Sequence, residues 1–387
     1  GNGVKPSFQS SWIDINNDGW LDLHVINDRT IHQDALYLNQ QDGTFLDVAP
    51  EIGLDLAIYS MSSSFADFDK DLDWDVFVSN GASSQNRLMS CLGAPSSLDS
   101  EIDLAYEDVA LQAGVVLTDL AWAGLWFDAD NNGWQDLLIT TGTSFPTDYP
   151  SVLDLYESAR TKLFTTFNGQ FPFSDVSAQL DNGVEFAFAA AYGDADQNGA
   201  LDVVVHRMGP TARLLHGVTF QGRWIQIELV GQPPNTRGIG AKVTAWRDGQ
   251  PDMRSLQCGT HYLGQSTYTL HFGLGNADAC DSVSVVWPTG QVQSFVDLPV
   301  NSRIQIEQPA IINDTGCTYA AACNYSPNSV IDDGSCDFSC LCQQGSVWSP
   351  NLMQCLPLCD HDLNGDGDVG LDDLLVFLGE FGESCLD

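Results

Sequence analysis

A nine-residue acidic motif occurs four times in the first 202 residues, and it constrains the fold more than any other feature of the sequence. Each copy has Asp at positions 1 and 9 and Asp or Asn at positions 3 and 5, and each runs into a β-rich apolar segment. The copies start 53, 61 and 66 residues apart. They span residues 14–22, 67–75, 128–136 and 194–202. Self-similarity at such a period is the signature of a repeat architecture.

A second pattern keeps phase with the acidic motif. An aromatic residue followed by x-Asp-Val occurs at Phe45, Tyr106 and Phe173, with its Asp 19 or 20 residues before the next acidic motif. Another short strand candidate lies between the two patterns: ALYLN, NRLMS or KLFTTFN. Several short strands per repeat predict the blades of a β-propeller, because solenoid repeats are usually shorter and the 3.6-residue period of helices is absent. The predicted fold class is therefore all-β.

The acidic motif has the chemistry of a calcium loop. Side-chain oxygens at positions 1, 3 and 5 converge when the chain turns tightly, and Gly at position 6 supplies the positive φ that the turn needs. A carbonyl at position 7 and the Asp at position 9 complete an all-oxygen shell of the kind that Ca²⁺ prefers. The alternative is a set of acidic surface turns without metal, but carboxylates packed this closely repel one another unless a cation is present.

These loops resemble the FG-GAP or VCBS blades of integrin-type β-propellers over residues 9–216. The resemblance implies five ligands in each loop, the position-7 residue contributing its carbonyl. In the first two loops they are Asp14, Asn16, Asp18, Trp20, Asp22, Asp67, Asp69, Asp71, Asp73 and Asp75. In the last two they are Asp128, Asp130, Asn132, Trp134, Asp136, Asp194, Asp196, Asn198, Ala200 and Asp202. The second loop departs from the pattern, since Leu72 replaces the expected Gly and predicts a strained turn.

The number of blades raises a question of closure. The family has about seven blades, whereas four acidic loops account for residues 1–216, and the first loop lacks a preceding aromatic-x-Asp-Val pattern. We therefore expect a propeller cut within its blades. The alternative is a four-bladed ring, in which strands near residue 216 would pair with strands near residue 10 and hide the sheet edges.

Residues 217–309, the middle domain, lose the acidic loops and remain β-rich. Strands are predicted at residues 224–229, 241–246, 268–272, 283–287 and 303–307. Arg237-Gly-Ile-Gly240, His261-Tyr-Leu-Gly-Gln-Ser266 and Val286-Trp-Pro-Thr-Gly290 resemble the ASPIC/UnbV domain. That domain follows FG-GAP propellers in secreted acidic proteins, a layout similar to that of the cartilage acidic proteins. No catalytic motif occurs, so His261 and His271 are interpreted as packed structural residues.

The last 78 residues predict two small modules. Residues 310–359 hold seven of the 11 cysteines and indicate a disulfide-stapled segment, with zinc as the rival interpretation. A further disulfide, Cys258–Cys280, is predicted in the middle domain. Residues 360–387 contain an EF-type loop that resembles a dockerin repeat and favours a bacterial source. Its predicted ligands are Asp362, Asn364, Asp366, Asp368 and Asp373.

Charge and cysteine usage restrict the function. The net charge is −38, which excludes clustered Lys/Arg surfaces for nucleic acids or anionic membranes, and no apolar run is long enough to span a membrane. The N-terminus has no signal-peptide pattern, so the chain is expected to be processed or to begin within a longer protein. The cysteine-rich segment favours a secreted or cell-surface location.

The leading hypothesis is a secreted, Ca²⁺-stabilised, non-catalytic adhesion or ligand-binding protein, with an extracellular protein or glycan as its partner and, through the tail, a cohesin-like partner. No catalytic residue and no organic cofactor is predicted. Two alternatives stay open: an extracellular polysaccharide-active enzyme with paired carboxylates, and a structural component of the envelope or matrix.

Overall fold

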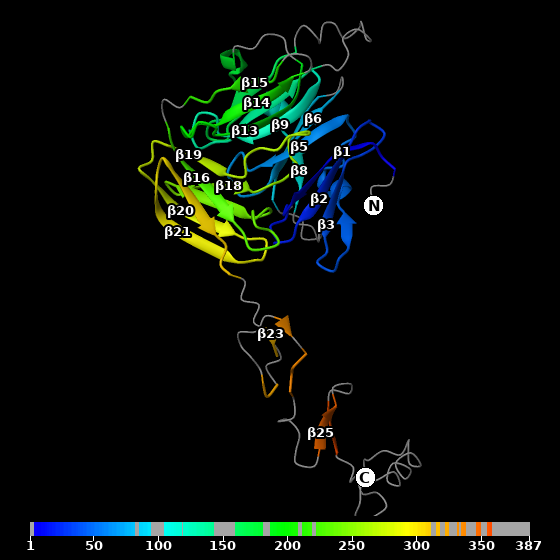
Figure 1. The fold of residues 1–387 in the computed structure, drawn as a ribbon. Helices are drawn as coiled ribbons and strands as arrows, with labels where there is room; N and C mark the ends of the chain where they lie inside the picture. The colour runs from blue at the N-terminus through cyan, green and yellow to red at the C-terminus, as the bar shows by residue number, and fades with distance from the viewer. Residues whose placement is uncertain are drawn as a thin grey trace, which may run out of the picture. The chain divides into compact units, whose positions relative to one another are not determined.

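The computed structural model describes residues 4–81, 85–93, 104–117, 119–142, 159–180, 186–207, 211–218 and 222–310, together with short stretches after residue 310. The chain divides into two compact units, Gly1–Pro309 and Ala310–Asp387. Each unit is described by itself; the first runs from blue to yellow in Figure 1 and the second is orange. The described residues are nearly all β, as the sequence predicts. Among them, no helix has the length and apolar character needed to cross a membrane.

Four antiparallel sheets follow one another along the chain as propeller-like blades. Blade 1 contains β1 (Ser7–Ile13), β2 (Asp22–Asn27), β3 (Ala35–Asn39) and β4 (Phe45–Asp47). Blade 2 contains β5 (Ser60–Ala66), β6 (Asp75–Asn80), β7 (Arg87–Cys91) and β8 (Tyr106–Asp108). Blade 3 contains β9 (Ala121–Phe127), β10 (Asp136–Thr141), β11 (Lys162–Thr165) and β12 (Ser174–Asp175). Blade 4 contains β13 (Ala187–Gly193), β14 (Asp202–Arg207) and β15 (Arg213–Leu215).

Single helical turns follow the last strands of blades 1 to 3: α1 (Ala49–Ile52), α2 (Ala110–Ala113) and the 3-10 turn η2 (Ser177–Leu180). Every acidic motif forms the loop between the first and second strands of its blade. The core lies between consecutive sheets. Phe65 and Trp74 pack in the cluster that joins blades 1 and 2, and Phe68 stacks on Trp126 between blades 2 and 3. This burial of apolar faces between neighbours is what makes each blade depend on the next.

The first strand of each blade is missing from the sequence prediction. These strands are rich in Ser, Ala and Gly, as in SMSSSFA of β5, which is buried along its whole length. Small residues are needed because the first strands of successive blades approach one another. Gly124 of β9, for example, donates its amide to the Ser62 hydroxyl (3.2 Å), and a Cβ there would collide with the Phe77 ring.

No strand pairing joins the first blade to the last in the described residues. β1 pairs with β2 alone, and β15 pairs with β14 alone. Residues 260–267 of the middle domain bridge the gap instead. The Tyr262 amide donates to Gln9 Oε1 (3.3 Å) on β1, and the Thr267 amide donates to the Tyr192 carbonyl (2.9 Å) on β13. His261, Tyr262 and Leu263 all have positive φ, so this bridge is a tight left-handed turn.

The middle domain is built from two sheets that share one core. One has the order β19 (Leu270–Gly275), β16 (Arg223–Val230), β22 (Ser302–Glu307). The other has the order β18 (Gln250–Ser255), β17 (Lys242–Arg247), β20 (Ala279–Val286), β21 (Val292–Pro299). Their facing residues, among them Ile225, Phe272 and Trp287, form a single buried cluster. The five predicted strands are confirmed; the polar β18 and the half-exposed β21 are not foreseen.

The cysteines divide by unit. The predicted Cys258–Cys280 disulfide is wrong: both thiols are free, because Cys280 is buried with its Sγ on the Trp246 carbonyl (3.5 Å) while Cys258 is exposed beside Tyr268. Cys91 is also free and buried. In the second unit Cys317 and Cys336 form a disulfide, and Cys323 is disulfide-bonded too. Four short strands are described there: β23 (Thr315–Gly316), β24 (Ile331–Asp332), β25 (Ser346–Ser349) and β26 (Gln354–Pro357).

Candidate metal centres

The aspartate at position 9 of every acidic loop has the same two hydrogen bonds. One carboxylate oxygen accepts from the amide at position 2 of its own loop, at 3.0 Å from Ile15, 3.1 Å from Phe68, 2.8 Å from Ala129 and 2.9 Å from Ala195. The other accepts from an amide at or beyond the end of the third strand, at 2.8 Å from Asn39, 2.9 Å from Cys91, 2.8 Å from Thr166 and 2.8 Å from Gly217. Asp22, Asp75, Asp136 and Asp202 therefore fasten each loop to the third strand of its blade.

The first, third and fourth loops close around their position-1 aspartate in the same way. Its Oδ2 accepts from the position-6 glycine amide, at 3.1 Å between Asp14 and Gly19, 2.7 Å between Asp128 and Gly133, and 3.0 Å between Asp194 and Gly199. The three glycines have φ of 88°, 90° and 85°, as the turn requires. In all four loops the position-5 side chain accepts from the position-7 amide, within 2.7 to 2.9 Å.

The second loop carries the strongest unsatisfied charge. Leu72 takes φ 74° in the place of glycine, which confirms the strained turn predicted from the sequence. Asp67 is 1% exposed, and neither of its carboxylate oxygens completes a hydrogen bond; the Leu72 amide lies near but outside hydrogen-bond geometry. Asp69 Oδ1 is likewise buried and unpartnered. Burial, together with the negative charges of Asp252 and Asp71, raises the pKa of Asp67 to about 8.

Three loops bring three carboxylates to one point. Ligand oxygens lie within 4.8 Å of one another in the groups Asp67–Asp69–Asp71, Asp128–Asp130–Asp136 and Asp194–Asp196–Asp202. In the first loop Asp14, Asp18 and Asp22 do not gather so closely, although Asp14 Oδ1 is buried without a partner. Asp75 stays outside its group because both its oxygens are held by amides. Burial raises the pKa of Asp22 to about 7 and that of Asp136 well above its usual range.

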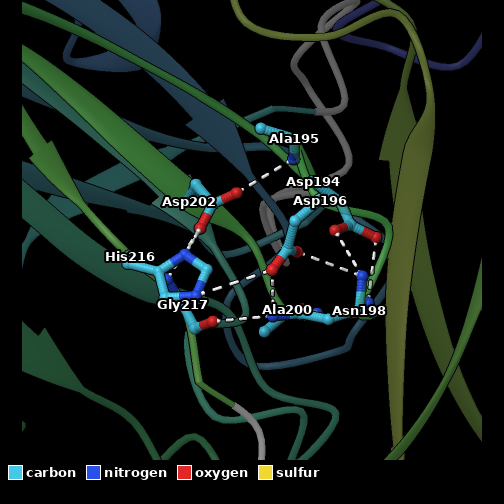
Figure 2. Close-up of polar contacts among 9 residues, drawn as sticks. Asp194, Ala195, Asp196, Asn198, Ala200, Asp202, His216 and Gly217 are labelled. Carbon is cyan, nitrogen blue, oxygen red and sulfur yellow. Dashed lines mark hydrogen bonds and ion pairs between the residues drawn. The ribbon is translucent and has the colours of Figure 1, made fainter.

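The fourth loop includes a residue that the sequence reasoning missed (Figure 2). His216 follows β15 and places Nδ1 2.8 Å from Asp202 Oδ1 and Nε2 3.5 Å from Asp196 Oδ2. Burial alone would raise the pKa of Asp202, but the hydrogen bonds from Ala195, Gly217 and His216 hold it below its usual range. The only signal in the sequence is that His216 directly precedes Gly217, whose amide binds the position-9 aspartate.

The middle domain contacts the acidic loops directly. Gln226 donates to Asp194 Oδ2 (2.7 Å), and Arg247 donates to the Asn132 carbonyl (2.8 Å). Lys242 donates to Asn17 Oδ1 in the first loop. Asp252 and Arg254 form a buried ion pair at 2.6 Å whose charges act on Asp67 and Asp128. The loops thus form the interface between the blades and the middle domain, a role that their sequence does not indicate.

His261 and His271 belong to the same interface. His261 Nδ1 lies 3.2 Å from the Gly124 carbonyl, and His271 Nε2 lies 3.1 Å from the Gly199 carbonyl. Burial lowers the pKa of each to about 4, so both are neutral at physiological pH. They are packed, hydrogen-bonded residues, as interpreted from the sequence.

We expect Gly273→Ala to lower the free energy of unfolding by about 1–3 kcal/mol, because a Cβ on β19 would collide with the Asp128 carboxylate and the Asn131 backbone. Thermal melts in millimolar Ca²⁺ measure the change. Gly193→Ala is the matched control, since its Cβ would meet only Thr267 at an ordinary 3.5 Å. Superimposable melts for the two variants would contradict this packing.

The predicted EF-type loop, Asp362 to Asp373, lies outside the described residues. The carbonyl ligands predicted at Trp20, Asp73, Trp134 and Ala200 also remain predictions.

Comparison with known proteins identifies two regions of the chain. Residues 14–78 match the FG-GAP-like repeat, and residues 231–313 match the ASPIC and UnbV family. Cartilage acidic protein 1 of Xenopus tropicalis is 24% identical over 288 residues, which cover 71% of this chain and 41% of that protein. The chain therefore spans about two fifths of the length of this relative. The V. cholerae biofilm matrix protein Bap1 is 9% identical with a TM-score of 0.23, over 74% of this chain and 48% of that one, which is too low to define a common fold. The chain thus joins FG-GAP-like repeats of a β-propeller-like fold to an ASPIC/UnbV domain, in a layout similar to that of cartilage acidic protein 1.

Proposed function

We propose that the chain is a calcium-binding, non-catalytic protein of the extracellular space that adheres to a protein or glycan ligand. In this proposal Ca²⁺ occupies the acidic loops, stiffens the blades and holds the middle domain against them. The blades and the middle domain then present one rigid surface to the ligand.

The observation that carries the calcium assignment is Asp67. A carboxylate that is 1% exposed and accepts no hydrogen bond is costly to bury as an anion, by several kcal/mol even after relaxation. Asp69 and Asp71 place further oxygens within 4.8 Å of its own, so the charge is compounded rather than neutralised. A divalent cation at that point removes both costs. The donors of this loop are all oxygens, which favours Ca²⁺ over metals that prefer nitrogen or sulfur.

The extracellular assignment is supported by the second unit and by the relatives. Disulfides such as Cys317–Cys336 persist in oxidising compartments. FG-GAP-like repeats and the ASPIC/UnbV domain are not catalytic signatures, and the middle-domain histidines are buried and neutral. A binding or matrix role therefore has more support than catalysis.

We expect Asp67→Asn to remove about one bound calcium per chain, because the amide keeps the shape of the side chain but loses the charge that the ion neutralises. The measurement is calcium content by mass spectrometry after equilibrium dialysis, with calorimetric titration of the EDTA-stripped protein. Asp42→Asn is the matched control, since Asp42 is exposed in the turn between β3 and β4.

Two results would overturn the calcium proposal: wild-type protein that binds no calcium at millimolar concentration, or an Asp67→Asn variant that keeps the full wild-type stoichiometry. A variant that instead loses every site would contradict independent loops. Glycoside hydrolysis by the wild-type chain would overturn the non-catalytic part.

A further inference from the structure

A groove of about 550 Å³ lies between blade 1 and the middle domain. Trp12 of β1, Trp20 of the first acidic loop and Asn39 line one side, while Lys242 of β17 lines the other. The volume falls within the range of small-molecule and oligosaccharide sites. The groove is distinct from the four acidic loops as metal centres, although it shares residues with the first of them.

The groove exposes two indole rings. Trp12 is 49% and Trp20 48% exposed, and Phe45 of β4, 42% exposed, meets the Trp12 ring edge-on at 6.1 Å between centroids. Neither tryptophan is needed for the core of blade 1, whose buried cluster contains Ile13 and Ile15 beside them in the sequence. Large aromatic faces left in solvent next to a cavity mark a binding surface.

Polar groups of both kinds accompany the rings. Asp14 lines the groove and offers an unpartnered carboxylate oxygen. Lys242 uses one of its three ammonium protons on Asn17 Oδ1 and keeps donor capacity for a ligand. An apolar ligand would leave these groups desolvated and unpaired, which is costly. A polyanion would meet a chain of net charge −38.

We propose that this groove binds a neutral oligosaccharide of pyranose rings with equatorial hydroxyls. Such rings expose flat faces of axial C–H groups that stack on indoles, and their hydroxyls both donate to carboxylates and accept from ammonium groups. The proposal rests on the proposed ligand-binding function and names the class of its ligand. Trp12 and Trp20 supply the stacking faces, and Asp14 and Lys242 the polar contacts.

The test uses the full chain in millimolar Ca²⁺ with cellohexaose and chitohexaose as probes, followed by calorimetry and tryptophan fluorescence. We expect saturable binding that weakens about tenfold or more in Trp12→Ala and in Trp20→Ala. Phe167→Ala is the matched control, because Phe167 is an aromatic residue 67% exposed outside the groove, and its variant should bind as the wild type does. An oligogalacturonate, which is anionic, should not bind.

Cys258 gives a second readout that does not depend on the tryptophans. Its exposed thiol lies on the groove, whereas Cys91 and Cys280 are buried, so the oligosaccharide should slow alkylation of Cys258 alone. Failure of both probes to bind a calcium-loaded wild type would overturn the groove proposal while leaving the calcium proposal standing. Binding that survives in both tryptophan variants, or leaves Cys258 alkylation unchanged, would overturn it equally.

Discussion

Removal of calcium with EDTA should lower the melting temperature of residues 1–309 as a whole, by on the order of 10 °C. Each occupied loop contributes RT ln(1 + [L]/Kd), roughly 1–3 kcal/mol at millimolar Ca²⁺. The sequence suggests that only the blades would suffer. The contacts of Gln226 with Asp194 and of Arg247 with the Asn132 carbonyl predict that the middle domain loosens with them.

Calorimetric melts and hydrogen exchange in Ca²⁺ and in EDTA measure this effect. Exchange should rise in the acidic loops and also in β16, β17 and β19 of the middle domain. Mg²⁺ at the same concentration is the control, because it demands tighter octahedral geometry and binds such loops less well. Exchange confined to the blades would show that the domains respond independently, and identical melts would refute calcium stabilisation altogether.

Acidification should destabilise the protein between pH 6.5 and 4. His24 and His261 are buried, and burial lowers the pKa of each to about 4, while an unfolded chain titrates near 6.5. The unfolded state therefore binds protons first as the pH falls. The stabilising contribution is complete above pH 6.5 and is lost toward pH 4, by roughly 3 kcal/mol for each histidine.

His24→Phe isolates one of these contributions. Neither ring nitrogen of His24 has a hydrogen-bond partner, and its ring meets Phe65 edge-on at 5.7 Å, so phenylalanine can keep the contact without the titration. Urea unfolding at pH 7 and pH 4.5 should show a smaller loss in the variant than in the wild type. His206→Phe, at an exposed position of β14, should leave the loss unchanged. An equal loss in all three proteins would contradict the assignment.

The repeat pattern fixed the architecture from the sequence alone. The acidic motif and the aromatic-x-Asp-Val pattern each depend on local turn chemistry and on alternation within one strand, so they identify the second, third and fourth strands of the blades. The first strands were not predictable in this way. Their Ser, Ala and Gly residues, as in β5, are selected by the close approach of neighbouring blades, which a local pattern does not contain.

The acidic loops show the same division. Spacing along the chain was enough to nominate their ligands, because positions 1, 3 and 5 converge through the turn itself. Only the tertiary structure decided that Asp75 is held by the amides of Phe68 and Cys91 and that His216 reaches the fourth loop, since these partners are 14 or more residues away or on another strand. The placement of the middle domain on the loops, and the free thiols of Cys258 and Cys280, likewise follow from packing between distant strands, which no spacing rule encodes.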